Sequence, residues 1–122
     1  MSRVIHFEIG AADTGKIMKF YSEVFGWKMQ KWEDGSEDYW LVITGDSSQP
    51  GINGGVFKSE GKPTVVNTIE VSNVDESAKK IEENGGTIVV PKTPVTGVGW
   101  LVYFKDIEGN LFGIMQEDSN AK

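Results

Sequence analysis

The sequence contains no cysteine, one arginine and one histidine among its 122 residues. Without cysteine the chain has no disulfide framework and no thiolate metal site, which is typical of a cytoplasmic protein. The eleven lysines are scattered and the net charge is −6, whereas binding to a phosphate backbone requires clustered basic residues. We therefore expect no nucleic-acid partner.

Long apolar runs are also missing. The longest have four or five residues, far fewer than the ~20 that cross a bilayer. No charged segment followed by an apolar one, as in a secretory leader, opens the sequence. We therefore expect no membrane partner and a cytoplasmic location. The 39% of hydrophobic and 25% of charged residues are typical of a folded globular protein, and the length fits one domain.

What the sequence does contain is an internal repeat. Trp40-Leu41-Val42 and Trp100-Leu101-Val102 are identical, and 100 minus 40 gives an offset of 60. The same offset carries Gly26 onto Gly86. A repeat of this kind indicates two copies of one supersecondary unit.

The first copy begins with an alternating stretch, VIHFEI (4–9), which predicts a strand. Asp13 can cap a helix over 14–25, where apolar residues recur at helical spacing, and Gly26 ends it. Strands are predicted over 28–33, 38–44 and 54–58.

The polar segment 59–63 predicts a linker, after which the same order returns. A strand is predicted over 64–71, and Asn73 and Glu76 have the spacing of a capping box at the start of a helix. Gly85 and Gly86 end that helix. Strands follow over 87–90, 99–104 and 110–115, with a turn over 106–110 before the last. The sequence thus predicts an α+β domain made of two βαβββ modules, about 3–58 and 63–117.

One helix covers only one face of each predicted four-stranded sheet. The other face must be buried by the sister module, a second chain or a ligand. A curved sheet with such a face is a natural cleft for a small molecule. Because about 60 residues cannot build a self-sufficient core, we expect a homodimer.

Five segments in this order, HFEI, KFYSEVFGW, GINGGVF, KKIEENGG and KDIEGNLFGI, resemble the vicinal oxygen chelate superfamily. That superfamily includes glyoxalase I, bleomycin-resistance proteins and extradiol dioxygenases, and the likeness is nearest to proteins related to lactoylglutathione lyase. The resemblance implies tandem βαβββ modules with curved mixed sheets. One departure is Ile107, which stands where a proline is common. Because one fold hosts many activities, function must be argued from the site.

The resemblance also implies where metal ligands would lie. In metal-dependent members, each module supplies a His or Gln from its first strand and a carboxylate from its last. His6 matches the first-strand position of the first module. The offset of 60 places Val66 at the equivalent position, or Thr68 after a shift of two residues, and neither is a usual ligand.

The last strands lack the implied carboxylates as well. Gly113 stands in place of the glutamate in the second module, and Gly54 or Gly55 in the first. Four implied ligands are thereby reduced to one. Because catalytic metal sites normally have three protein ligands, no metal ligand is assigned.

His6 itself keeps several interpretations. Glu8 lies on the same face of the strand, because side chains alternate with a period of two, while Phe7 and Ile9 take the helix-packed face. His6 and Glu8 could contact a ligand, or bind a metal with a third carboxylate from Glu70 or Glu117. His6 could also act as a general base whose pKa the carboxylate raises, or make a purely structural hydrogen bond.

Trp40 and Trp100 are equivalent by the repeat and could form an aromatic pair for a planar or cationic ligand. The alternation along their strands does not decide whether they face the cleft or the helices. The predicted ligand-binding residues are therefore His6, Glu8, Trp40, Thr68 and Trp100, with no catalytic residue assigned.

Two functions follow from this reading. The first is a metal-independent binder of a small organic molecule, resembling bleomycin-resistance proteins, with no cofactor. The alternative is a lyase, isomerase or dioxygenase of the glyoxalase I type, which uses a divalent metal with an atypical ligand set.

Overall fold

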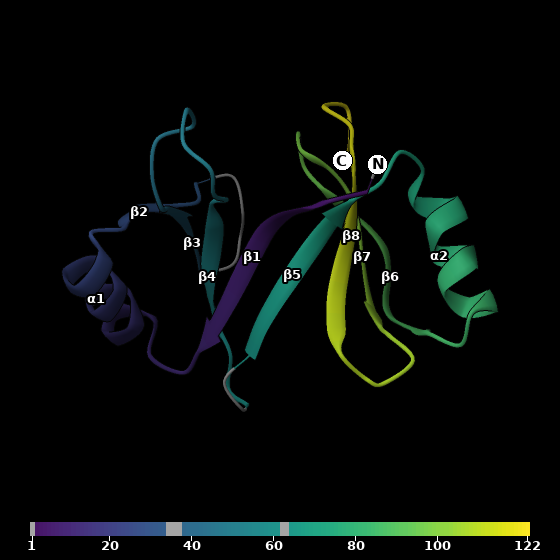
Figure 1. The fold of residues 1–122 in the computed structure, drawn as a ribbon, viewed down its shortest axis with the longest axis horizontal. Coiled ribbons are helices and arrows are strands. Elements are labelled where there is room, and N and C mark those ends of the chain that lie inside the picture. Colours follow the sequence, from purple (N-terminus) through teal and green to yellow (C-terminus); the bar gives the residue numbers. More distant parts are fainter. Residues whose placement is uncertain (1, 34–37, 62–63) are drawn as a thin grey trace. The chain divides into compact units, whose positions relative to one another are not determined.

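The structure is a computed structural model that describes residues 2–33, 38–61 and 64–122. It divides into two compact units, His6–Val65 and a second unit in which the residues up to Ile5 join Val66–Lys122. In its described part each unit has one helix and four strands (Figure 1). This is the predicted α+β arrangement; that the two modules form one domain stays a prediction.

The first unit follows the predicted order of elements: β1 (Val4–Ala11), α1 (Thr14–Phe25), β2 (Lys28–Lys31), β3 (Tyr39–Ile43) and β4 (Gly54–Lys58). Its strand order is β2-β3-β4-β1. β1 runs parallel to β4, and the other pairs are antiparallel. β2 is shorter than predicted, since Trp32 and Glu33 lie beyond its end.

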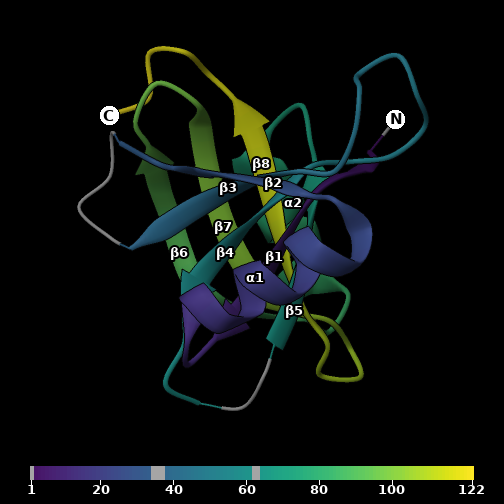
Figure 2. The ribbon, with the colours of Figure 1, turned by 90° about the vertical axis from the view of Figure 1, so that its left-hand side faces the viewer.

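Helix α1 begins and ends where the sequence predicts. The Asp13 carboxylate accepts from the backbone N–H of Lys16 at 3.0 Å. Gly26 adopts the left-handed conformation (φ 74°), and its N–H donates to the carbonyl of Ser22. Figure 2 views the unit from the side of α1, which packs on β2 and β4.

An aromatic stack joins α1 to the sheet. The rings of Tyr21 and Trp27 are stacked with centroids 4.8 Å apart. Trp27 in turn lies 5.8 Å from the ring of Phe7. The stack therefore places Phe7 of β1 on the helix side of the sheet, as the alternation predicts.

The second unit contains β5 (Thr64–Glu70), α2 (Val74–Glu83), β6 (Thr87–Val95), β7 (Gly99–Lys105) and β8 (Leu111–Glu117). Its strand order is β5-β8-β7-β6. The prediction for β6 was too short: the strand continues from Val90 to Val95. The register shifts between Ile88 and Val90 and between Val90 and Thr93, and Pro91 lies in the second of these irregularities. Pro94 is the register partner of Trp100, which β6 tolerates as an edge strand.

The core of the second unit lies between α2 and its sheet. Its buried members are Val71, Val74, Val102, Phe104 and Ile114. α2 packs on β6, β7 and β8, and Asn73 caps it by accepting from the N–H of Glu76 at 3.0 Å.

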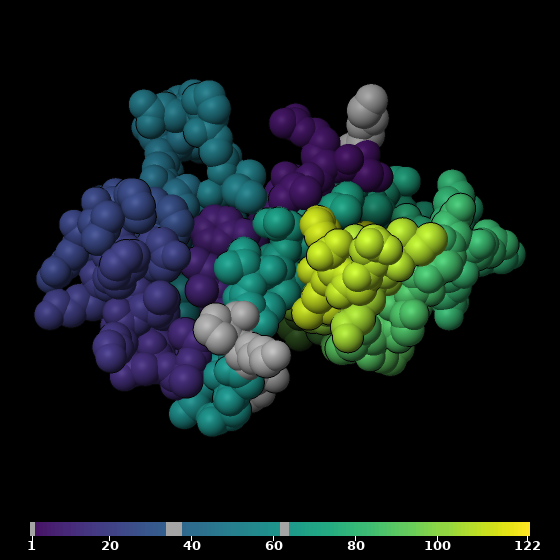
Figure 3. All heavy atoms as spheres, turned by 60° about the horizontal axis from the view of Figure 1, so that its bottom comes forward, coloured from purple at the N-terminus to yellow at the C-terminus, as the bar shows by residue number. Residues whose placement is uncertain are grey.

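The turn over 106–110 lies against the end of α2 (Figure 3). A Cβ atom at Gly85 would be 3.4 Å from the side chain of Ile107. No helix of the described residues is long and apolar enough to span a membrane.

Candidate ligand-binding site

One face of the first unit's sheet gathers polar side chains. Because Phe7 lies on the helix side of β1, His6 and Glu8 lie on the opposite side. Glu8 is beside Gly55 in the parallel β1–β4 register, and Gly55 is opposite Leu41 of β3. We call the face formed by His6, Glu8, Tyr39, Leu41, Gly55 and Phe57 the His6 face.

His6 is hydrogen-bonded to a tyrosine from two strands away. Its Nε2 atom lies 2.9 Å from the hydroxyl oxygen of Tyr39. β4 separates the two strands, so the Tyr39 ring crosses over β4 at Gly55. A Cβ atom at residue 55 would overlap the hydroxyl and ring of Tyr39. The missing side chain at Gly55 therefore makes this hydrogen bond possible.

Burial dominates the electrostatics of His6. Loss of water around the imidazole lowers its pKa, and the Glu8 carboxylate only partly offsets this effect by raising it. The pKa of His6 is thus below its ordinary value of 6.5. Glu8 raises this pKa as expected, but the expected net increase is wrong, because burial outweighs the carboxylate and the sequence does not reveal the extent of burial. His6 is neutral at pH 7.

As the only histidine, His6 gives one set of imidazole signals in NMR spectra. We expect its titration midpoint below 6.5 in the folded protein. The unfolded chain then binds more protons than the folded one at slightly acidic pH, so stability is full above pH 6.5 and falls as pH drops towards the folded pKa. Urea unfolding at several pH values in this range should show that the free energy of unfolding of the wild type falls as the pH drops. The same fall should be smaller in His6→Asn. A midpoint above 6.5 would contradict the account.

Trp40 lies on the opposite face from His6. It shares its side of β3 with Val42, which is 1% exposed, and is opposite Val56 of β4. Its indole N–H donates to Asp38 at 3.2 Å, and Lys31 Nζ lies 5.2 Å from its ring centroid. Trp40 is therefore on the α1 side of the sheet.

Trp100 has the same surroundings in the second unit. It packs against the buried core under α2. Its N–H donates to Asp118 at 3.0 Å, which lowers the pKa of that carboxyl, and Lys92 Nζ lies 4.9 Å from the ring centroid. Each tryptophan thus belongs to the helix side of its own sheet.

Thr68 is 3% exposed and is opposite Gly113 in the β5–β8 register. A Cβ atom at Gly113 would be 3.1 Å from its hydroxyl oxygen. Of the predicted ligand-binding residues, the structure places only His6 and Glu8 together on one described face. Ligand contact by Trp40, Thr68 or Trp100 stays a prediction.

Tyr39 was missed by the sequence reasoning, and so was the space that Gly55 leaves for its ring. The available signal was the alternation along YWLVI, which separates Tyr39 and Leu41 from Trp40 and Val42. It could have assigned Tyr39 to the face opposite Trp40. Its contact with His6 required the strand order as well.

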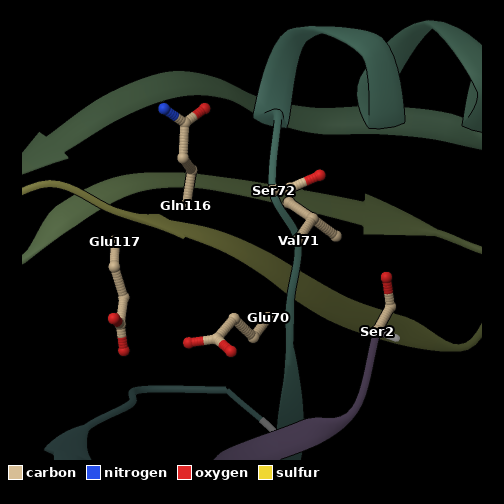
Figure 4. A pocket seen from close by; sticks show the side chains of 6 residues that line it. All are labelled: Ser2, Glu70, Val71, Ser72, Gln116 and Glu117. Atoms are coloured by element: carbon tan, nitrogen blue, oxygen red, sulfur yellow. The ribbon is translucent and has the colours of Figure 1, made fainter.

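The second unit has a pocket of its own at the ends of β5 and β8, with a cavity volume of about 500 Å³ (Figure 4). Its lining residues are Ser2, Glu70, Val71, Ser72, Gln116 and Glu117. A hydrogen bond between the carboxyl groups of Glu70 and Glu117 and the repulsion between their charges raise the pKa of Glu70. Partial loss of water around Glu70 raises it further. Glu70 therefore keeps its proton to a higher pH than an isolated carboxyl does.

Replacing Glu70 with Gln should stabilise the protein at neutral pH. A raised folded pKa means that the contribution of Glu70 to stability is present below its ordinary pKa and is lost as pH rises through the folded value. Glutamine removes the repulsion and still donates a hydrogen bond to Glu117. In thermal unfolding, the melting temperature of Glu70→Gln should exceed that of the wild type at about pH 7, and the difference should be smaller at about pH 4. Glu108→Gln, which removes an exposed carboxylate of the same unit, is the control and should not reproduce this pattern.

A divalent metal does not fit the donors of the His6 face. Nε2 of His6 is already hydrogen-bonded to Tyr39, and Glu8 is the only carboxylate in the set that defines this face. Among residues 2–33, 38–61 and 64–122, no group of three or more His, Cys, Asp or Glu side chains could hold a metal ion. Catalytic metal sites normally require three protein ligands.

Comparison with known proteins agrees with this architecture. The model of the Glyoxalase/Bleomycin resistance protein/Dioxygenase superfamily matches residues 3–114. The chain therefore belongs to this superfamily, as the resemblance predicted. No curated protein matches the sequence.

Solved structures match over nearly the whole chain. Methylmalonyl-CoA epimerase from Mycobacterium tuberculosis is 14% identical, with a TM-score of 0.68 over 94% of this chain and 87% of its own. A variant of the Streptomyces coelicolor epimerase, in complex with 2-nitronate-propionyl-CoA, is 15% identical, with a TM-score of 0.67 over 94% and 96%. The Mn(II)-bound glyoxalase from Novosphingobium aromaticivorans is 16% identical, with a TM-score of 0.70 over 99% of this chain and 41% of its own. These likenesses show the fold.

Proposed function

We propose that this protein binds a small organic molecule on the His6 face without a metal ion, in the manner of bleomycin-resistance proteins. The observation that supports this most is the hydrogen bond of 2.9 Å between His6 Nε2 and the Tyr39 hydroxyl. It occupies one of the two imidazole nitrogens through which histidine binds metals. It also leaves a neutral polar pair beside the Glu8 carboxylate.

The residues of this face favour a ligand with a polar group on an apolar body. Leu41, Tyr39 and Phe57 are partly exposed and can contact an apolar or planar part. The Glu8 carboxylate can accept from an N–H or O–H group, and the net charge of −6 attracts cations rather than anions. We therefore favour a neutral or cationic organic ligand.

NMR signals of His6 and Tyr39 provide the test. Titration with a panel of aromatic amines, carboxylic acids and CoA esters should shift these signals for one of the neutral or cationic members. These shifts should saturate as the ligand concentration rises. Tryptophan fluorescence is a weaker probe, because Trp40 and Trp100 lie on helix-packed faces.

Two controls sharpen the ligand experiment. Tyr39→Phe, which removes one hydroxyl from the face, should weaken binding, whereas Trp40→Phe, on the other side of the sheet, should leave the His6 shifts intact. Saturable shifts only with an anionic ligand would contradict the proposed preference. No response to any compound would count against binding at this face.

A second copy of the chain completes this site in our proposal. The His6 face carries partly exposed apolar residues that a partner would cover, and one helix cannot cover both faces of a sheet. A cytoplasmic homodimer is thus part of the proposed function. Light scattering should give twice the mass of the chain, and a monomer at micromolar concentration would remove this part of the proposal.

One observation favours the alternative, a metal-dependent lyase or isomerase. The Mn(II)-bound glyoxalase has the same fold, and His6 matches the first-strand ligand position implied by the resemblance. Elemental analysis of protein purified without chelators separates the two functions. Stoichiometric metal that is lost in His6→Asn would support the alternative.

A further inference from the structure

Tyr39 and residue 55 compete for the same space on the His6 face. The Tyr39 ring crosses β4 directly over Gly55, where even a methyl group would overlap the hydroxyl. A side chain at position 55 and the hydrogen bond between Tyr39 and His6 therefore exclude each other. Only a glycine leaves room for the bond.

This competition decides which donors surround His6. Gly55 is the register partner of Glu8, so a carboxylate at 55 would lie beside Glu8 and on the same face as His6. That arrangement would supply three ligands of the kinds that divalent cations bind. Instead, this chain has the phenol of Tyr39 at that place, within 2.9 Å of the imidazole.

A neutral imidazole has one nitrogen with a free lone pair. If the Tyr39 hydroxyl donates to Nε2, that lone pair is occupied and the proton of the ring lies on Nδ1. A metal ion at Nε2 would have to displace the phenol. The hydrogen bond thus acts directly on the atom through which His6 would coordinate a cation.

We propose that Tyr39 is a specificity-determining residue: by donating to Nε2 of His6 in the space left by Gly55, it excludes divalent cations from the His6 face. This inference rests on the proposed function only in that it concerns the same face. Its test needs no organic ligand, so the two can fail separately.

The probe is Mn²⁺ alone, measured by paramagnetic broadening of the single set of His6 imidazole signals. Tyr39→Phe keeps the ring and removes the hydroxyl, and should bind Mn²⁺ about tenfold more tightly than the wild type. The double variant Tyr39→Ala/Gly55→Glu adds the third ligand and should bind about a hundredfold more tightly. Adding His6→Asn to the double variant removes these signals, so the Mn²⁺ affinity of that variant is measured by water-proton relaxation, and the gain should be abolished.

Tyr21→Phe is the matched control. It removes a phenolic hydroxyl from α1 of the same unit, where the ring stacks on Trp27, and should leave the Mn²⁺ affinity at the wild-type value. The nitrogen shifts of His6 report the tautomer independently: the proton should be on Nδ1 in the wild type and redistribute in Tyr39→Phe.

Three results would overturn the inference. The first is a wild type that binds Mn²⁺ at His6 as tightly as the double variant. The second is a Tyr39→Phe protein with unchanged Mn²⁺ affinity, a result that stands even if the double variant does not fold. The third is a wild-type proton on Nε2. Conversely, tighter Mn²⁺ binding in Tyr39→Phe, together with failure of every organic ligand, would support this inference and contradict the proposed function.

Discussion

A strand packed under a single helix turns only every second side chain towards that helix, and this constraint arranges the candidate site. On β1 the ring of Phe7 belongs to the stack with Trp27, which leaves His6 and Glu8 on the other face. On β3 the same alternation sends Trp40 to the helix side and Tyr39 to His6. The polar face of the first unit is therefore a direct consequence of how its apolar residues pack.

The two modules have stayed alike on their helix sides and have diverged on the opposite faces. Trp40 and Trp100 each donate to an aspartate and lie beneath a lysine, although those partners come from different positions in the two repeats. On the other faces, one module pairs His6 with Tyr39, whereas the other buries Thr68 beside Gly113. Packing under a helix restricts substitution more than the opposite face does, so function can change there while the fold persists.

Local features were predictable because short-range interactions determine them. Asp13 and Asn73 cap the starts of the two helices and Gly26 ends the first one. Each does so through a hydrogen bond to a residue three or four positions away. The contact between His6 and Tyr39 spans 33 residues and depends on the strand order β3-β4-β1, which no local pattern contains. The direction of the His6 pKa was missed for the same reason, since it depends on burial by residues distant in sequence.

The identity of residue 55 decides which side chain lies over β4 beside His6. A carboxylate at position 55 would lie beside Glu8 in the β1–β4 register, on the same face as His6. It would also displace the Tyr39 ring. A glycine admits the ring, and the phenol is then hydrogen-bonded to Nε2 of the imidazole. The exchange needs no change in strand order or helix packing, because only the side chains over β4 rearrange. A donor set assembled from adjacent strands can therefore be lost through a single glycine, while the surface around it remains available to an organic ligand.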